Sequence, residues 1–333
     1  MLKLPNDTDI KAETLKAYLA RQHAASDTAS VLEAIADATG ALADRLAAGS
    51  LPGDPGEVVG TNESGDRQKA LDVGAHLHMV EALRAAGVRQ LLSEEAEEII
   101  LLNPDGTLDV AIDPIDGSGS IGTGAPLGTL FSILPATEQG FLCTGRSVIA
   151  AGYVAFGHST DLGFSLGNGL HLAVFDRAEG TFRMLRENHR VPAKSRTLAF
   201  NASNARHWPE AVKRFSEDVL KGKEGRLGEN YNMRWLASAV GEFHRILLQG
   251  GLFFYPGDQR PGYESGRLRL IYEAIPIAFL IEQGGGKATD GQSPILDLMP
   301  ESLHQNIPLI FGSPENVDMF ITYCADRAQH AEG

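Results

Sequence analysis

Six residues that begin at Asp113 and read Asp-Pro-Ile-Asp-Gly-Ser constrain the fold of this chain most. They follow the run Asp109–Ile112, which has the length and apolar character of a strand, so both aspartates are expected at the mouth of a strand. Pro114 keeps the residue before it extended, and Gly117 permits a sharp turn. The two carboxylates and the carbonyl oxygen of Ile115 can therefore converge on one ion.

A second acidic segment, Ser93-Glu94-Glu95, lies upstream and alone would be expected to be a solvated loop. Together with Asp113 and Asp116 it offers four carboxylates beside a Gly/Ser turn, whose backbone N–H groups can bind an anion. Magnesium prefers hard oxygen ligands and shares its shell with substrate phosphates. The pattern predicts a metal site for the hydrolysis of a phosphate ester. The alternative for the aspartates is an Asx turn that caps a strand.

Charge and cysteine usage exclude several kinds of partner. The formal net charge of −14 would repel nucleic acids and anionic membrane surfaces. No run approaches the length of about eighteen apolar residues typical of a membrane span, and the N-terminus lacks the apolar core of a signal peptide. Cys143 and Cys324 fit no metal or redox spacing and favour a reducing compartment. We therefore expect a cytoplasmic protein that acts on a small molecule.

The hydrophobic pattern predicts two fused α/β halves. Helices are expected over residues 10–48, 70–86, 209–221, 232–248, 270–283 and from 314 onward. Strands are expected over 98–102, 108–112, 128–134, 148–156, 170–175, 197–200, 252–255 and 307–311, and a long loop over 50–66. The polar stretch 187–196 is the candidate boundary, which divides the chain into halves of residues 1–194 and 195–333.

Two short motifs suggest other chemistry and are rejected on their context. Residues 117–122 match the GxGxxG dinucleotide fingerprint, which requires a helix to begin at the turn, whereas Pro126 and the run 128–134 predict another strand. Residues 163–167 match the GxSxG nucleophile elbow, but the strand expected next makes a hairpin the better interpretation. A nucleotide-cofactor oxidoreductase is therefore only a remote alternative.

The C-terminal half carries longer and more specific motifs. The run Gly266–Pro276, which reads GRLRLIYEAIP, resembles the signature of class I fructose-1,6-bisphosphatases. The Ser-Glu-Glu and Asp-Pro-Ile-Asp-Gly-Ser segments fit the same family in the same order, as do residues 128–131, 285–291, 302–305 and 312–314. The Asp-Pro-Xaa-Asp-Gly motif alone would indicate only the wider lithium-sensitive sugar-phosphate phosphatase superfamily. The resemblance extends from about residue 60 to residue 325.

This resemblance implies a layered α-β-α-β-α fold and an enzyme that removes the 1-phosphate of D-fructose 1,6-bisphosphate. It implies two or more Mg²⁺ ions per subunit, with Mn²⁺ a possible substitute, and a homotetramer that serves gluconeogenesis or the Calvin cycle. A sedoheptulose-1,7-bisphosphatase, or one enzyme for both sugars, is the nearest alternative because the metal site would be the same. A catalytically silent paralogue is the third, and the presence of every matched carboxylate argues against it.

The resemblance also implies a role for each matching residue. The implied metal ligands are Glu94, Asp113, the carbonyl of Ile115, Asp116 and Glu273. The residues implied to take part in metal binding and water activation are Asp66, Asp72 and Glu95. The implied substrate-binding residues are Asp116, Gly117, Ser118, Asn201, Arg234, Tyr255 and Arg267, with Arg234 reaching into the neighbouring subunit's site.

The chain departs from the family's usual pattern at several positions. Arg267 and Trp235 replace a usual lysine and tyrosine, Asn204 occupies another tyrosine's place, and Gly119-Ser120 replaces Ser-Asn. In relatives that respond to AMP, basic and hydroxyl side chains bind its phosphate, whereas this chain has Thr107-Leu108 and Pro135 at two of those places. The resemblance therefore predicts a vestigial effector region in the first half and no inhibition by AMP.

Overall fold

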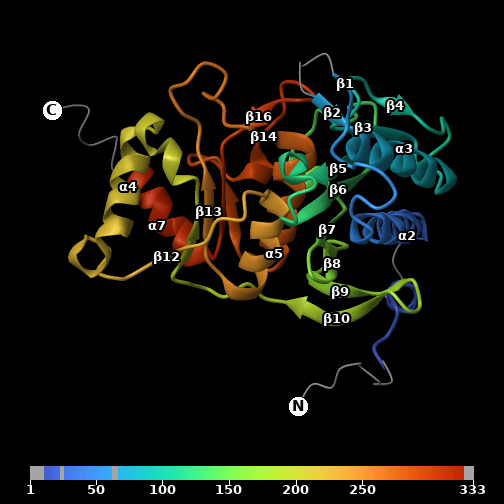
Figure 1. Cartoon of the computed structure of the whole chain (residues 1–333), viewed down its shortest axis with the longest axis horizontal. Coiled ribbons are helices and arrows are strands. Elements are labelled where there is room, and N and C mark those ends of the chain that lie inside the picture. The colour runs from blue at the N-terminus through green and yellow to red at the C-terminus, as the bar shows by residue number, and fades with distance from the viewer. Residues whose placement is uncertain (1–10, 23–25, 62–66, 326–333) are drawn as a thin grey trace.

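Two sheets, separated and flanked by helices, form the protein (Figure 1). The computed structural model describes residues 11–22, 26–61 and 67–325. The larger sheet has the strand order β10-β9-β8-β7-β6-β5-β3-β4 and is antiparallel except where β3 pairs with β5. Its strands are β3 (Gln90–Ser93), β4 (Ile100–Leu101), β5 (Leu108–Asp116), β6 (Leu127–Pro135), β7 (Ala150–Phe156), β8 (Thr160–Ser165), β9 (Leu170–Asp176) and β10 (Thr181–His189).

The smaller sheet has the order β12-β11-β13-β17-β15, with β11 parallel to both of its neighbours. Its strands are β11 (Thr197–Ala199), β12 (Asn232–Met233), β13 (Leu252–Tyr255), β15 (Lys287–Thr289) and β17 (Leu309–Gly312). Two short antiparallel pairs complete the strands: β1 (Val58–Thr61) with β2 (Arg67–Lys69), and β14 (Leu268–Arg269) with β16 (Asn306–Ile307).

Helices make the remaining three layers. Their bounds are α1 (Leu15–Arg21), α2 (Ser26–Ala47), α3 (Ala70–Ala85), α4 (Glu210–Lys221), α5 (Ala239–Gln249), α6 (Ile275–Gln283) and α7 (Pro314–Ala325). Helices α1 to α3 cover the outer face of the larger sheet, and α4 and α7 cover the outer face of the smaller one. Helices α5, labelled in Figure 1, and α6 pack between the two sheets. The order of layers is α-β-α-β-α, as the resemblance predicted.

The central strand β5 shows how the fold points side chains at the site. All nine of its residues are buried, so both faces of the strand are covered. Val110 and Ile112 pack in the core beneath α2 and α3, whereas Ala111 packs in the core around α5 and α6. Because side chains alternate along a strand, Asp113 lies on the same face as Ala111, toward the α5–α6 layer. The strand thus carries its first aspartate to the junction of the two halves.

Several predicted elements are confirmed, and several boundaries were wrong. The described residues of segment 10–48 contain two helices, and those of the predicted loop 50–66 contain β1. The expected helix over 232–248 starts only at Ala239, because β12 pairs with β11 and Ser238 then caps α5. The strand expected over 307–311 is two strands that separate at Pro308, which has no N–H for a sheet hydrogen bond.

Both rejected motifs have the structural context that was expected. The GxGxxG turn leads through a single 3₁₀ turn, Ser118–Ser120, to strand β6. The GxSxG segment lies where β8 turns into β9, and the two strands pair as an antiparallel hairpin. Among the described residues, no helix has both the length and the apolar character needed to cross a membrane.

Candidate active site

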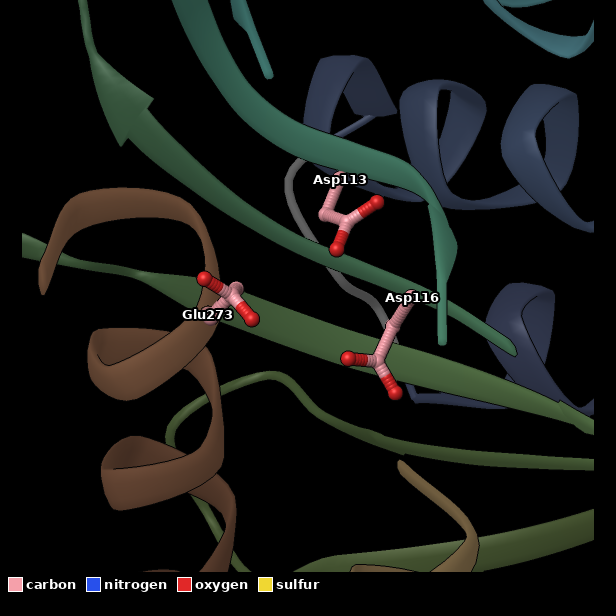
Figure 2. A group of neighbouring side chains, drawn as sticks. All are labelled: Asp113, Asp116 and Glu273. Atoms are coloured by element: carbon pink, nitrogen blue, oxygen red, sulfur yellow. The ribbon is translucent and has the colours of Figure 1, made fainter. Parts of the chain in front are cut away.

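Three buried carboxylates meet where β5 ends beside α6. Ligand oxygens of Asp113, Asp116 and Glu273 all lie within 4.8 Å of one another, and the three side chains are 2%, 5% and 6% exposed. Figure 2 shows the two aspartates reaching from the strand toward the glutamate on the facing helix. The pairing of β5 with β6 shifts register between Asp113 and Asp116. Such a bulge re-aims a side chain, and here it brings both aspartates to one place.

Glu94 joins this cluster from the end of β3. Its carboxyl group hydrogen-bonds to that of Asp113, and burial, with the charges of Glu95 and Asp116, raises its pKa to about 7. Burial and the neighbouring carboxylates likewise raise the pKa of Asp113 and of Glu273 well above the usual range. These four carboxyl groups resist ionising together, and a divalent cation bound among them would relieve their mutual repulsion.

Asp116 is held by the N-terminus of α5. Its Oδ2 accepts hydrogen bonds from the backbone N–H of Val240 at 2.8 Å and from the hydroxyl of Ser238 at 3.1 Å. Burial raises the pKa of Asp116, and these two donors act in the opposite direction because they favour its ionised form. Ser238 is also the N-cap of the helix, where its Oγ accepts from Gly241 N–H. One serine therefore starts α5 and orients a carboxylate from the opposite half.

Glu273 lies in a π-helical turn, Leu270–Ala274, that continues into α6. Such turns are rare and occur frequently at functional sites. The Oε2 of Glu273 accepts the backbone N–H of Arg269 at 2.5 Å. The Arg269 guanidinium donates to the carbonyl of His304 at 2.8 Å, and its positive charge opposes the rise in the pKa of Glu273.

A cavity of about 350 Å³ opens beside this cluster. It is lined by Gln68, Lys69, Asp72, Glu94, Glu95, Ala96, Glu97, Ser118, Gly119, Arg267, Arg269, Tyr272 and His304. A larger groove of about 710 Å³ lies elsewhere, between α4 and α7, and contains none of the predicted site residues. Because Glu94 both lines the smaller cavity and touches Asp113, that cavity is the one connected to the carboxylates.

Asp72 and the turn at residues 117–119 face this cavity from two sides. Burial and the charge of Glu95 raise the pKa of Asp72 to about 6, and its Oδ1 is buried without a hydrogen-bond partner in the described part of the chain. Gly117 has φ +84°, which favours glycine, and a Cβ there would also be crowded at 3.1 Å from the Ser238 hydroxyl. Lys69 donates to the carbonyl of Ser118 and ties this turn to α3.

The structure distributes the remaining predicted residues unevenly. Arg267 lines the cavity. Tyr255 is the last residue of β13, and Asn201 lies two residues after β11, so the parallel register of the two strands would place them opposite each other. Arg234 directly follows the neighbouring β12. These three do not line the cavity, and Arg234 is exposed. Asp66 lies outside the described residues, and the roles predicted for the substrate-binding residues stay predictions.

Sequence reasoning missed four groups beside these carboxylates: Lys69, Ser238, Arg269 and His304. Arg269 lies inside the GRLRLIYE run that carried the resemblance, and Ser238 had a detectable signal as the serine before a helical pattern. His304 lies in the segment 302–305 that fits the family, although the segment gave His304 no role, and nothing in the sequence near Lys69 indicated its contacts. Both are brought to the cavity by tertiary packing alone.

Buried carboxylates beside a basic-edged cavity, on an α-β-α-β-α fold, are typical of a metal-dependent phosphatase of the α/β class. Residues 13–187 match the family described as fructose-1-6-bisphosphatase, N-terminal domain, and residues 191–325 match its C-terminal domain. The chain is 51% identical over 328 residues to class 1 fructose-1,6-bisphosphatases of Brucella suis and Brucella abortus, covering 97% of this chain and 96% of each relative.

A solved structure agrees with the sequence matches. The holo form of Leishmania major fructose-1,6-bisphosphatase is similar with a TM-score of 0.88 and 28% identity, over 94% of this chain and 99% of that one. The chain therefore belongs to the class 1 fructose-1,6-bisphosphatase family. This membership confirms the predicted family, the layered α/β fold and the prediction of a phosphatase.

Proposed function

We propose that the chain hydrolyses the 1-phosphate of D-fructose 1,6-bisphosphate with divalent metal ions and releases fructose 6-phosphate and phosphate. The observation that carries this proposal is the cluster of buried carboxylates joined through Glu94 to a cavity edged by arginine and lysine. Carboxylates suit the metal and cationic side chains suit the substrate's phosphates. The likeness to enzymes named for this substrate supports the same activity.

The donor set fits Mg²⁺, with Mn²⁺ a possible substitute. Every candidate ligand is an oxygen, and the buried, unpartnered Oδ1 of Asp72 is available for an ion or its water. We propose that two or more ions are held by Glu94, Asp113, the carbonyl of Ile115, Asp116 and Glu273, with Asp72 and Glu95 nearby. When bound, such ions would neutralise phosphoryl oxygens and lower the pKa of a water molecule.

The chain's own residues then orient the substrate and accept a proton. We propose that Asp72, Glu95 or Asp66 takes the proton of the attacking water, and the raised pKa of Asp72, about 6, is suited to a general base near neutral pH. The turn at Gly117 and Ser118 would bind the 1-phosphate through backbone N–H groups, since the first N–H groups of a helical turn have no partner inside it.

The second phosphate would bind among residues of the C-terminal half. Arg267 lines the cavity and offers a planar guanidinium that suits a phosphate. Asn201 and Tyr255 are proposed to contact the sugar and its 6-phosphate from the adjoining sheet edge. In this division of labour, residues 1–194 supply most of the metal ligands, and residues 195–333 supply sugar-phosphate binding and Glu273.

We further propose a cytoplasmic homotetramer that serves gluconeogenesis or the Calvin cycle, with Arg234 completing a neighbouring subunit's site. The exposure of Arg234 leaves its side chain available to a second subunit. Neither Cys143 nor Cys324 forms a disulfide in the described part of the chain, as is usual in a reducing compartment.

Product analysis tests the proposed reaction. With Mg²⁺ and fructose 1,6-bisphosphate, we expect phosphate and fructose 6-phosphate in equal amounts, and no fructose 1-phosphate. Sedoheptulose 1,7-bisphosphate should be assayed in parallel, since a clear preference for it would replace the proposed substrate while leaving the reaction class intact. Release of the 6-phosphate, or no release of phosphate from either sugar, would refute the proposal.

A further inference from the structure

Two arginines approach the ring of one tyrosine at the edge of the active-site cavity. The Cζ of Arg260 lies 4.0 Å from the centroid of the Tyr263 ring, and the Cζ of Arg267 lies 4.7 Å from it. Both distances are within the range of a cation–π interaction. Of these two arginines only Arg267 lines the cavity, so the ring links the cavity to the loop of residues 258–263, which carries Arg260.

The charge of Arg260 is neutralised by an aspartate, and backbone hydrogen bonds hold the loop that carries it. Asp258, which is 6% exposed, accepts hydrogen bonds from the Arg260 Nε at 3.0 and 3.1 Å and forms an ion pair with that guanidinium. The backbone N–H of Asp258 donates to the carbonyl of Tyr263 at 2.9 Å, and the N–H of Tyr263 donates to the carbonyl of Arg260 at 3.0 Å. These contacts within the loop fix the position of the Tyr263 ring.

The backbone of Arg267 is fixed as well. Gly266 has φ +78°, and a Cβ there would lie 2.5 Å from the carbonyl oxygen of Ile307, so the chain passes too close to β16 for any other residue. Strand β14 begins at Leu268, directly after Arg267, and pairs with β16. The freedom that Arg267 retains is therefore that of its long side chain.

Arg267 is the partner whose charge is not compensated. Its guanidinium makes no hydrogen bond or ion pair with any residue in the ranges that the structure describes, and its contact there is the Tyr263 ring. A flat ring can hold a guanidinium plane in one orientation while leaving its N–H groups available to a ligand. This arrangement is suited to binding an anion with an arginine that is already oriented.

We propose that Tyr263 is a positioning residue, which holds the Arg267 guanidinium at the cavity for the phosphate that is not hydrolysed. The Asp258–Arg260 ion pair fixes the ring that does so. The inference rests on the proposed function, in which Arg267 binds the second phosphate of the sugar bisphosphate. It assigns a role to residues 258–263 that the family motifs do not cover.

Steady-state kinetics of four variants test the inference. Tyr263→Leu removes the ring and should raise KM for fructose 1,6-bisphosphate about two- to fivefold with kcat unchanged, the size expected for one partly exposed cation–π contact. Tyr263→Phe keeps the ring and should restore the KM. Arg267→Ala should raise KM further. The matched control is Arg226→Ala. The Cζ of Arg226 lies 5.2 Å from the centroid of the Tyr323 ring, and neither residue lines the cavity, so this variant should leave KM unchanged.

The double variant and a smaller substrate separate positioning from general disruption. In an Arg267→Ala background, Tyr263→Leu should have no further effect, and neither change should alter KM for fructose 1-phosphate, which lacks the second phosphate. If Tyr263→Leu leaves KM unchanged while Arg267→Ala raises it, the positioning role is wrong and the proposed function stands. If Arg267→Ala itself leaves KM unchanged, the phosphate site assigned to Arg267 is wrong. An equal loss in Tyr263→Leu and Tyr263→Phe would also overturn the role of the ring.

Discussion

Replacing Asp113 by asparagine should stabilise the metal-free protein while abolishing turnover. Asparagine has the same shape, and its side-chain oxygen can still accept the backbone N–H of Ile115, which donates to Asp113 Oδ1 at 2.9 Å. The substitution therefore removes a negative charge from the carboxylate cluster without opening a cavity. If Asp113 only supported the fold, the protein would not become more stable when this residue lost its charge.

The expected magnitude follows from the spacing of the cluster. Oxygens of Asp113 lie within 4.8 Å of those of Asp116 and Glu273. At an effective dielectric constant of about 20, each fully ionised pair at that spacing is unfavourable by about 3 kcal/mol. The raised pKa values show that retained protons relieve part of this repulsion. We therefore expect Asp113→Asn to stabilise the protein in EDTA by about 1–3 kcal/mol, and the melting temperature to rise by a few degrees.

The pH dependence has a definite sign. Burial and neighbouring charges raise the pKa of Asp113 in the folded state, so the folded protein binds more protons than the unfolded chain. The penalty is absent below the unfolded-state pKa of about 3.9 and grows as the pH rises above it. The stabilisation by Asp113→Asn should accordingly be larger at pH 8 than at pH 5.

Asp109→Asn provides the matched control. Asp109 lies on the same strand and is 1% exposed, but it pairs with Arg89 at 2.9 and 2.5 Å. Removing its charge leaves a partly buried arginine unpaired and should destabilise the protein by about 3 kcal/mol. The same chemical change should thus have opposite signs at two positions of β5.

Thermal unfolding in EDTA, followed by circular dichroism, measures both variants. Phosphate release in Mg²⁺ should fall at least about a hundredfold for Asp113→Asn, since a bound ion supplies several kcal/mol of charge stabilisation. If Asp113→Asn destabilises the metal-free protein as much as Asp109→Asn does, the cluster is not the repulsive site inferred from its geometry.

Three further predictions concern the surroundings of the site. Ser238→Ala should destabilise the protein by about 1 kcal/mol through loss of the α5 cap and should raise the Mg²⁺ concentration for half-activation about ten- to a hundredfold, because a ligand loses its supporting hydrogen bond. Normal Mg²⁺ activation of this variant would contradict the assigned role of Asp116. Arg234→Ala should raise KM without changing the mass of the proposed tetramer in light scattering, and a fully active monomeric wild type would refute the shared site. AMP should not inhibit at low micromolar concentration. Thr107, in the vestigial effector region, donates to the carboxylate of Asp27, and this carboxylate would repel the phosphate of AMP. Half-inhibition in the low micromolar range would overturn this prediction.

The sequence was most informative where local rules determine the structure. The segment from Asp113 to Gly117 could be placed at the end of a strand, because an apolar run, a proline and a turn glycine each restrict the backbone. The two rejected motifs were excluded correctly for the same reason, since the strands that follow them have strong apolar signals. Glu273 was found through the family's motif, because the two aspartates that it meets lie more than 150 residues away in the chain.

Elements and contacts that depend on tertiary structure were missed. Strand β10 lies at the edge of the larger sheet and buries only one side chain fully, that of Phe182, so it has no apolar pattern, and β3 is only four residues long. The predicted start of α5 was wrong because the pairing of β12 with β11 overrides the helical pattern before Ser238. The stack of Tyr263 with two arginines depends on how a loop folds back on itself, and no periodicity in the sequence reports that.

One measurement tests the central claim, that the buried carboxylates form the metal centre of a phosphatase. Wild-type protein is stripped with EDTA, and phosphate release from fructose 1,6-bisphosphate is then followed as Mg²⁺ is added back, beside Asp113→Asn under the same conditions. We predict no turnover without metal, saturable recovery in the wild type and no recovery in the variant. Turnover that persists in EDTA, or a variant that recovers like the wild type, would contradict the claim.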